Sequence, residues 1–156
     1  MSRIYTRDEL AQARKEWRNQ GKRLVLTNGC FDILHPGHIR LLEQAKDLGD
    51  ILIVAVNTDA STQRLKGPRR PLNNEMDRAR LLQSLACVDG VILFPEDTPR
   101  ELVSAVMPDV LVKGADWSGF VAGREEVEAA GGEVRLIALE PGQSTTHTVE
   151  AILGSV

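Results

Sequence analysis

The sequence lacks the features that mark membrane-bound and secreted proteins. No apolar run approaches the roughly 20 residues needed to cross a bilayer, and residues 1–5 lack the long apolar run of a signal peptide. Its two cysteines, Cys30 and Cys87, have neither metal-ligand spacing nor a disulfide-rich pattern. We therefore expect a cytoplasmic protein with reduced thiols and no membrane partner.

An excess of positive charge is also missing, since 19 lysines and arginines face 22 aspartates and glutamates. A net charge of −3 gives no general basic field to attract nucleic acid, so we expect no nucleic-acid partner. Neither glycine-rich phosphate motif, the dinucleotide fingerprint or the P-loop, is present. A phosphate site in this chain must therefore come from local geometry and a few placed cations.

What the sequence does contain is an alternation of short apolar runs and amphipathic segments. A length of 156 residues suits one domain with one core, and no linker or repeat interrupts it, so we interpret residues 1–156 as a single domain. The runs predicted to be strands are 24–26, 51–56, 91–94, 110–112 and 134–137. Strands that alternate with helices predict an α/β protein with a Rossmann-like, doubly wound, five-stranded parallel sheet and helices on both faces.

Local signals bound the segments between these strands. Residues 6–9 form a capping box ahead of a helix that should end near Gly21. A second helix should start near Gly37 and end at Gly49. The polar and basic segment 57–71 contains helix-breaking residues, and we predict that it is a functional loop.

The turn after the first strand carries the strongest chemical signal. In parallel sheets, ligands bind at the carboxyl ends of the strands, and that end is followed here by Gly29, Asp32, His35, Gly37 and His38. The start of a helix exposes N–H groups that suit phosphate, and Gly37 lets the backbone approach closely. Two histidines three residues apart lie on one side of such a helix start, where they can donate hydrogen bonds to phosphate, more strongly if protonated. A single histidine would more simply be a capping and packing residue.

Residues 29–38, Gly-Cys-Phe-Asp-Ile-Leu-His-Pro-Gly-His, resemble the GxFDxxHxGH signature of the cytidylyltransferase-like nucleotidyltransferases. Segments that resemble the middle loop of that family are 57–59, 66–67, 70–71 and 77–78. Segments 112–117 and 142–146 are most similar to heptose 1-phosphate adenylyltransferases. The resemblance covers nearly the whole chain and points to the C-terminal domain of bifunctional heptose kinase/adenylyltransferases, here standing alone.

This resemblance implies transfer of AMP from ATP to D-glycero-β-D-manno-heptose 1-phosphate, which gives ADP-heptose and pyrophosphate for lipopolysaccharide or another surface glycan. The sugar phosphate would attack the α-phosphorus in line. Because no protein nucleophile is evident, positioning and electrostatics would supply most of the catalysis. Mg²⁺ is expected to arrive with ATP, and the sequence shows no protein-built metal cage. Relatives suggest a homo-oligomer, which we expect to be a dimer.

The resemblance also implies a set of site residues. The catalytic residues would be His35, His38 and Lys66, with Lys66 as a cation that closes the site. The nucleotide-binding residues would be Asn28, Gly29, Cys30, Phe31, His35, Gly37, His38, Lys113, Gly114, Asp116, Ser144, Thr145 and Thr146. The sugar-phosphate-binding residues would be Asp32, Lys66, Arg70 and Arg78.

Several of these residues also have simpler roles open to them. From composition alone Lys66 would be a solvated surface lysine, and one or two of Arg69, Arg70 and Arg78 would be surface charges. Asp32 suits a turn cap as well as it suits binding of sugar hydroxyls, orientation of a lysine or placement of Mg²⁺. The residues that would otherwise serve as loop or helix caps are Asp116 and Ser144 to Thr146.

Other functions of the same fold are a cytidylyltransferase for a polyol or amino-alcohol phosphate and an FMN adenylyltransferase. Glycerol-3-phosphate cytidylyltransferases carry an arginine shortly before the Ser-Thr-Thr motif, whereas residues 139–142 contain no cation, which disfavours that assignment. A nucleotide-binding sensor without turnover belongs to a different class. The presence of His35, His38 and Lys66 together argues against it.

Overall fold

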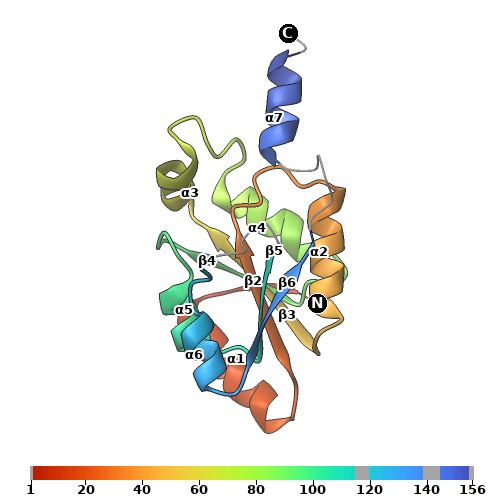
Figure 1. The fold of residues 1–156 in the computed structure, drawn as a ribbon, viewed down its shortest axis with the longest axis vertical. Helices are drawn as coiled ribbons and strands as arrows, with labels where there is room; N and C mark the ends of the chain where they lie inside the picture. The colour runs from red at the N-terminus through yellow and green to blue at the C-terminus, as the bar shows by residue number, and fades with distance from the viewer. Residues whose placement is uncertain (1, 115–119, 139–144, 155–156) are drawn as a thin grey trace.

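The computed structural model of the chain describes residues 2–114, 120–138 and 145–154. Its centre is a six-stranded sheet in the order β1-β4-β3-β2-β5-β6 (Figure 1). The strands are β1 Arg3–Tyr5, β2 Leu24–Gly29, β3 Ile51–Asn57, β4 Gly90–Phe94, β5 Val110–Gly114 and β6 Glu133–Ile137. All neighbouring pairs are parallel, and the inner strands are buried on both faces, which explains their continuous apolar runs.

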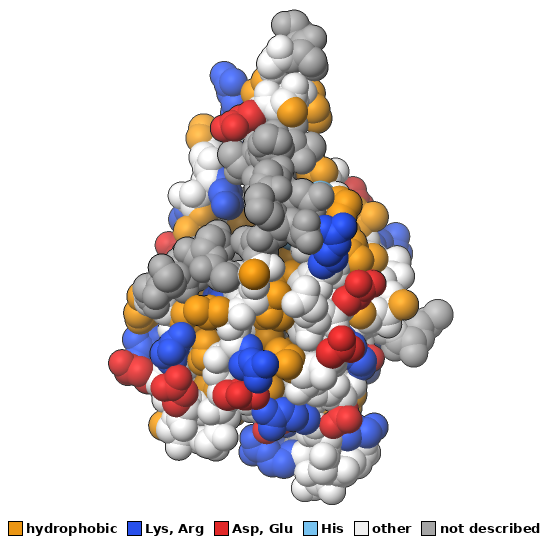
Figure 2. All heavy atoms as spheres, turned by 45° about the vertical axis from the view of Figure 1, so that its right-hand side comes forward, with side chains coloured by type: hydrophobic (Ala, Val, Ile, Leu, Met, Phe, Trp, Pro, Cys, Tyr) orange, Lys and Arg blue, Asp and Glu red, His pale blue; other side chains and the backbone are white. Residues whose placement is uncertain are grey.

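Helices cover both faces of the sheet. The helices in the described ranges are α1 Arg7–Asn19, α2 Pro36–Lys46, α3 Asp59–Lys66, α4 Glu75–Gln83, α5 Arg100–Val106, α6 Arg124–Ala129 and α7 Thr145–Gly154, of which α7 projects away from the sheet (Figure 1). On one face α1, α5 and α6 bury a cluster that includes Leu10, Leu102 and Val127, whereas on the other α2 and α4 bury Leu42 and Leu82. None of these helices in the described ranges is long and apolar enough to span a bilayer. On the face drawn in Figure 2, acidic and basic side chains lie interspersed among hydrophobic and other ones.

The strand order reverses beside β2. From β2 the chain continues through β3 to β4 on one side, and it returns to β5 and β6 on the other side. The carboxyl ends of β2 and β5 therefore flank the topological switch point, where open parallel sheets bind ligands. Thr27 joins the two strands near this point, because its Oγ1 donates a hydrogen bond to Val112 O at 3.0 Å. The fold thus places the turn after β2 at the expected ligand site.

The doubly wound parallel fold is confirmed, but the predicted number of five strands is wrong. The additional strand, β1, pairs with β4 at the edge of the sheet. Three residues are too few to show an alternating pattern, and they run directly into the Thr6–Glu9 capping box, which the structure confirms. Packing of the Tyr5 ring against Gly90 holds this strand, and local sequence does not reveal such a long-range contact.

The predicted loop over 57–71 is also wrong, because its first half forms α3. Thr58 caps this helix by accepting a hydrogen bond from the Ser61 N–H at 3.2 Å. The buried residues of α3 are Ser61 and Thr62, so the helix shows no apolar periodicity that sequence reasoning would detect. Only residues 67–74 remain as a connection to α4.

Substitution of Gly90 by alanine should weaken the attachment of β1. A Cβ at this position would lie 2.5 Å from Tyr5 Cε2 and 2.8 Å from Ile53 Cδ1. Because this overpacks a buried junction, we expect the free energy of unfolding, measured in urea, to fall by about 1–3 kcal/mol. Gly154→Ala is the control, since a Cβ there meets no atom within 4 Å and should change stability by less than about 0.5 kcal/mol. Equal stabilities of the two variants would contradict this packing.

Candidate active site

Two histidines form the start of α2, directly beyond β2. His35 is the N-cap residue, and its Nδ1 accepts a hydrogen bond from the Gly37 N–H at 3.1 Å. His38 completes the capping box, because its Nδ1 accepts from the His35 N–H at 3.3 Å. The two rings stack, with centroids 3.8 Å apart and planes inclined by 24°. The predicted position of both imidazoles on one side of the helix start is confirmed.

These capping bonds determine which ring nitrogens carry protons. Because both Nδ1 atoms accept hydrogen bonds, a neutral imidazole at either position carries its proton on Nε2. The Nε2 atom of His35 is buried and has no hydrogen-bond partner among the described residues. An unpaired buried donor is uncommon in folded proteins and costs free energy. It indicates a group that is available to an oxygen atom of a ligand.

Both imidazoles are neutral near pH 7. Burial and, to a smaller extent, the neighbouring His35 together lower the pKa of His38 to about 4. Burial also lowers the pKa of His35 from its ordinary value. The two rings of the ligand-free protein are therefore neutral hydrogen-bond donors. The sequence analysis had left open that they are protonated, and in the ligand-free protein they are not. A bound polyanion would raise both pKa values by favouring the charged form.

The backbone of the turn adopts a conformation that few residues tolerate. Phe31 has a φ of 50°, in the left-handed region, at a cost of roughly 1 kcal/mol or more. Its ring packs against the imidazole of His38, with the centroids 5.2 Å apart. The approach of this ring also favours a glycine at position 29, because a Cβ on Gly29 would lie 3.0 Å from Phe31 Cε2 and the ring would have to shift slightly. Phe31 and Gly29 together set the path of the turn that carries the histidines.

Asp32 is a buried anchor for the connection between α3 and α4. Its carboxylate accepts hydrogen bonds from the backbone N–H groups of Leu72 and Asn73 at 2.9 Å and from Arg70 Nε at 2.7 Å. Burial alone would raise the pKa of Asp32, but the hydrogen bonds from Asn73, Leu72 and Arg70 outweigh it and hold the pKa below its ordinary value. The side chain has no exposed surface, so it orients Arg70 and this connection and does not face a sugar hydroxyl or Mg²⁺.

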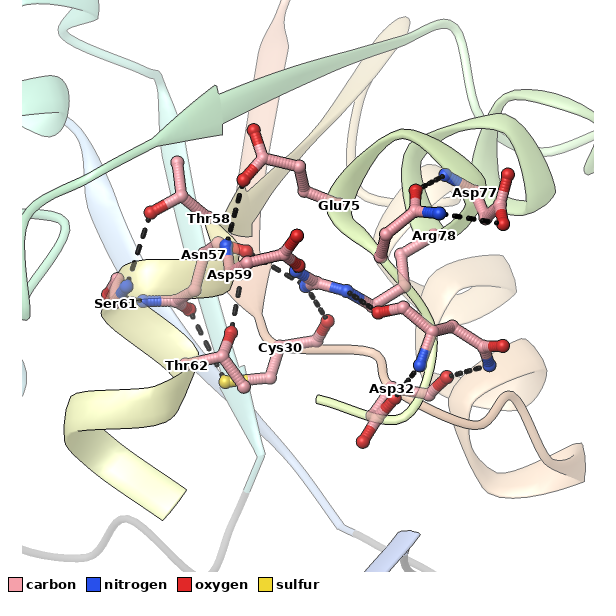
Figure 3. A network of polar contacts seen from close by, with 12 residues as sticks. Cys30, Asp32, Asn57, Thr58, Asp59, Ser61, Thr62, Glu75, Asp77 and Arg78 are labelled. Carbon is pink, nitrogen blue, oxygen red and sulfur yellow. Dashed lines mark hydrogen bonds and ion pairs between the residues drawn. The ribbon is translucent and has the colours of Figure 1, made fainter. Parts of the chain in front are cut away.

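Arg78 lies fully buried within the polar network of Figure 3. Its Nη1 donates hydrogen bonds to Cys30 O at 2.6 Å and to Asn57 O at 2.8 Å. Its Nε donates to Asn73 O at 3.0 Å, and its Nη2 pairs with Asp59 Oδ1 at 2.8 Å. With each nitrogen bonded to protein and no exposed surface, the guanidinium has no atom to offer the expected sugar phosphate. It joins the ends of β2 and β3 to the starts of α3 and α4 instead.

The cations Lys66, Arg69 and Arg70 lie near the end of α3. Lys66 and Arg69 are exposed, and neither side chain has a hydrogen bond or ion pair with another residue in the described ranges. Arg70 is held differently, because its side chain is only 13% exposed and its Nε is bonded to Asp32. Its two Nη atoms have no partner within the described part of the chain. Arg70 therefore combines a fixed position with free donor atoms.

The remaining expected residues lie around the switch point or outside the described residues. Lys113 and Gly114 end β5, and the Lys113 side chain is largely buried. Asn28, near the end of β2, has a buried Oδ1 without a hydrogen-bond partner in the described ranges. The expected residues that lie outside the described part are Asp116 and Ser144, together with the side chains of Thr145 and Thr146.

Sequence analysis did not identify two asparagines, Asn57 and Asn73, as part of the hydrogen-bond network around the site. Asn57 ends β3, and its Nδ2 donates a hydrogen bond to Ser61 Oγ at 2.9 Å, while its backbone carbonyl accepts from Arg78. Asn73 Nδ2 donates to the backbone oxygen of Asp32 at 2.7 Å. The position of Asn57 directly after a buried apolar run was a usable signal, because polar residues at that edge of a parallel sheet face the ligand site. Nothing local distinguishes Asn73 from an ordinary helix-capping residue.

No cluster of three or more His, Cys, Asp or Glu side chains suited to a metal ion occurs in the ranges that the structure describes. The nearest carboxylate to the histidine turn along the chain, Asp32, already accepts hydrogen bonds from three residues. The described residues therefore do not form a metal site made by the protein alone, and an ion carried by the phosphates of a ligand would not need one.

Residues 26–149 match a family model described as Cytidylyltransferase-like. The chain belongs to this family. The matched range contains the histidine pair, Arg70 and Arg78, so the buried network and the helix-capping imidazoles are both features of a cytidylyltransferase-like protein.

Curated relatives extend over nearly the whole chain. It is 52% identical over 155 residues to the bifunctional protein HldE of Citrifermentans bemidjiense, a match that covers 99% of this chain and 32% of that protein. It is 53% identical over 150 residues to the bifunctional protein HldE of Photorhabdus laumondii, covering 96% of this chain and 32% of the relative. The chain thus spans about a third of the length of these relatives.

Two solved structures are similar to this chain, one in sequence and fold and the other in fold alone. The lipopolysaccharide core biosynthesis protein of Thermoplasma volcanium is 35% identical with a TM-score of 0.63, and the match covers 77% of this chain and 98% of that one. Pantoate-beta-alanine ligase from Francisella tularensis has a TM-score of 0.67 but only 15% identity, over 94% of this chain and 69% of the ligase. The ligase therefore shows a shared fold alone.

The lowered pKa of His38 predicts a loss of stability in mild acid. An unfolded histidine titrates near 6.5, so between that value and about 4 the unfolded state binds protons that the folded state excludes. The free energy of unfolding should therefore fall by about 1–3 kcal/mol as the pH is lowered from 7 to 4. Urea titrations at several pH values measure this change. His38→Gln does not titrate and should show a flatter profile, and parallel profiles for the two proteins would contradict the neutral assignment.

Proposed function

We propose that this chain is an adenylyltransferase that transfers AMP from ATP to D-glycero-β-D-manno-heptose 1-phosphate, giving ADP-heptose and pyrophosphate. The proposal rests chiefly on His35 Nε2, a donor with no partner in the part of the chain that the structure describes. The His35 ring is stacked on that of His38 at a helix start, in a chain that belongs to a family of nucleotidyltransferases. Identities near 50% with HldE proteins over nearly the whole chain support the choice of acceptor. A product used for lipopolysaccharide agrees with the name of the Thermoplasma volcanium relative, a lipopolysaccharide core biosynthesis protein.

The proposed reaction joins two anions in one step. An oxygen of the sugar phosphate bonds to the α-phosphorus of ATP while the bond to the β-phosphate breaks, and pyrophosphate leaves with that electron pair. Negative charge grows on the oxygens of the transferring and leaving phosphates. Neutral donors that are already oriented stabilise this charge without reorganising, which suits the Nε2–H groups of His35 and His38.

Positive charge would come from the other side of the turn. Lys66 has an exposed ammonium without a described partner, and we assign it to the triphosphate. Arg70 has a fixed Nε, and its Nη atoms have no partner among the described residues, which suits two-point binding of the acceptor's phosphate. Mg²⁺ would arrive with ATP and neutralise part of the triphosphate charge. In this proposal, Asp32 positions Arg70 and has no direct contact with the substrates.

The nucleoside would lie along the carboxyl ends of β2 and β5. We assign its contacts to Asn28 on one strand and to Lys113 and Gly114 on the other, with Asp116 accepting from a ribose hydroxyl. The residues proposed for the β- and γ-phosphates are Ser144, Thr145 and Thr146, at the start of α7. These assignments rest on the family motif and on the position of the switch point.

The direct test is pyrophosphate release with a panel of nucleotides and phosphate acceptors. We expect turnover with ATP and heptose 1-phosphate at a kcat/KM at least about a hundredfold above that of any CTP pair. A strong preference for CTP with a polyol phosphate, or for FMN as acceptor, would replace this function by one of those alternatives. Tight nucleotide binding without turnover for any acceptor would indicate a sensor.

Loss of the His38 imidazole should affect turnover more than ATP binding. We expect His38→Ala to lower kcat by about a hundredfold to a thousandfold, because a donor that acts mainly on the transition-state charge is removed. The KM for ATP should change by less than about tenfold. Thermal unfolding measured in parallel corrects for the capping bond to His35, whose loss costs about 1 kcal/mol. An unchanged kcat would exclude a catalytic role.

Lys66 can be tested against a neighbouring cation. We expect Lys66→Ala to lower kcat by at least about tenfold, since a charge that stabilises the leaving pyrophosphate is lost. Arg69→Ala removes an equally exposed positive charge from the same segment, and its kcat should stay within about twofold of the parent protein. Equal effects of both substitutions would reduce the role of Lys66 to the general field of this surface.

A further inference from the structure

The buried guanidinium of Arg78 holds one particular backbone carbonyl of the phosphate-binding turn. Its Nη1 donates to Cys30 O at 2.6 Å, from a side chain with no exposed surface (Figure 3). The same atom also donates to Asn57 O at 2.8 Å, so it is fixed between the ends of β2 and β3. An arginine can bind several oxygens in different directions because its nitrogens form a planar fork, whereas a lysine has a single nitrogen.

The position of this carbonyl determines the direction of the next N–H group. A peptide unit is planar, and in the trans form the C=O of one residue points opposite to the N–H of the next. The Cys30–Phe31 bond is trans, since the cis bond found in the described residues is Arg70–Pro71. With Cys30 O drawn toward Arg78, the Phe31 N–H points away from the guanidinium. No residue in the described ranges accepts a hydrogen bond from that N–H.

We infer that Arg78 is a positioning residue that turns the Phe31 N–H toward a phosphate of the bound nucleoside triphosphate. The left-handed backbone of Phe31, with a φ of 50°, is a conformation that the surroundings must enforce. The hydrogen bond from Arg78 to Cys30 O supplies that constraint from inside the protein. This inference rests on the proposed function, because it requires a triphosphate at the start of α2.

A purely structural role for Arg78 predicts a different result. If the guanidinium only stabilised the fold, its loss would weaken binding of all parts of the nucleotide together. If it orients the Phe31 N–H, its loss should weaken binding of the phosphates and leave binding of the nucleoside unchanged. Adenosine and ATP share the base and ribose and differ only in the phosphates, so the ratio of their dissociation constants separates the two roles.

The test compares Arg78→Lys with the parent chain by titration with ATP and with adenosine. The lysine keeps the positive charge for Asp59 but has no planar fork to hold both carbonyls. We expect the dissociation constant for ATP to rise about tenfold, the value of one hydrogen bond to a charged group, while that for adenosine stays within twofold. Equal rises for both ligands, or no change for ATP, would overturn the inference.

Asp59→Ala is the matched control. It removes the carboxylate that pairs with Arg78 Nη2 but leaves the bond from Nη1 to Cys30 O. The Asp59 side chain is 42% exposed, so water can replace it. This variant should lose stability while keeping the ratio of the ATP and adenosine dissociation constants within twofold of the parent. A tenfold change in this ratio would assign the effect to general loosening of the network.

A measurement on the unsubstituted chain covers the case in which Arg78→Lys does not fold. In ¹H–¹⁵N spectra, the Phe31 amide proton should move downfield on addition of ATP or inorganic pyrophosphate and stay in place with adenosine. A Phe31 amide that does not respond to ATP, although the chain binds it, would overturn the positioning role. If neither ATP nor pyrophosphate binds at all, the proposed function fails, and this outcome is distinct from a normal ATP complex with a silent Phe31 amide.

Discussion

Burial of the Arg78 guanidinium is the constraint on which the site depends. An unpaired charge in the interior costs several kcal/mol, so the chain must bring oxygens from separate segments to one point. Cys30 and Asn57 supply carbonyls from the ends of β2 and β3, Asn73 supplies one from the connection before α4, and Asp59 supplies a carboxylate from α3. The segments at the carboxyl edge of the sheet are therefore held together by buried hydrogen bonds, beneath the surface that we propose as the nucleotide site.

The hydrogen-bond donors of the candidate site are of two kinds, neutral imidazoles and positively charged side chains. His35 and His38 are neutral because burial opposes their charge, and they are held by hydrogen bonds from the backbone of the helix that they cap. The cations lie in and after the last turn of α3. The buried carboxylate of Asp32 fixes Arg70, whereas Lys66 is exposed to solvent. A chain with a net charge of −3 can in this way offer a polyanion a local environment that differs from its overall charge.

Much of the fold was predictable because its signals are local. The strand at 51–56 is a continuous apolar run, and the doubly wound arrangement follows from its alternation with helices. The failures share a cause. Residues 3–5 form a strand only because they reach β4 across the chain, and α3 has a polar buried side that pairs with Asn57 and the backbone of Glu96. In both cases the element is stabilised by contacts with residues distant in sequence, and it lacks the periodic apolar pattern from which helices and strands are predicted.

The sequence by itself determined that a parallel α/β sheet carries two histidines on one side of a helix start after its first long strand, because the spacing of His35 and His38 is a local property of a helix start. Only the tertiary structure decided that the histidines are neutral and that Asp32 and Arg78 face protein groups. A pKa and the direction of a charged side chain depend on burial, and burial is set by segments that are distant in sequence. From the sequence alone, a buried arginine that orients a peptide group looks the same as a surface arginine that binds a substrate.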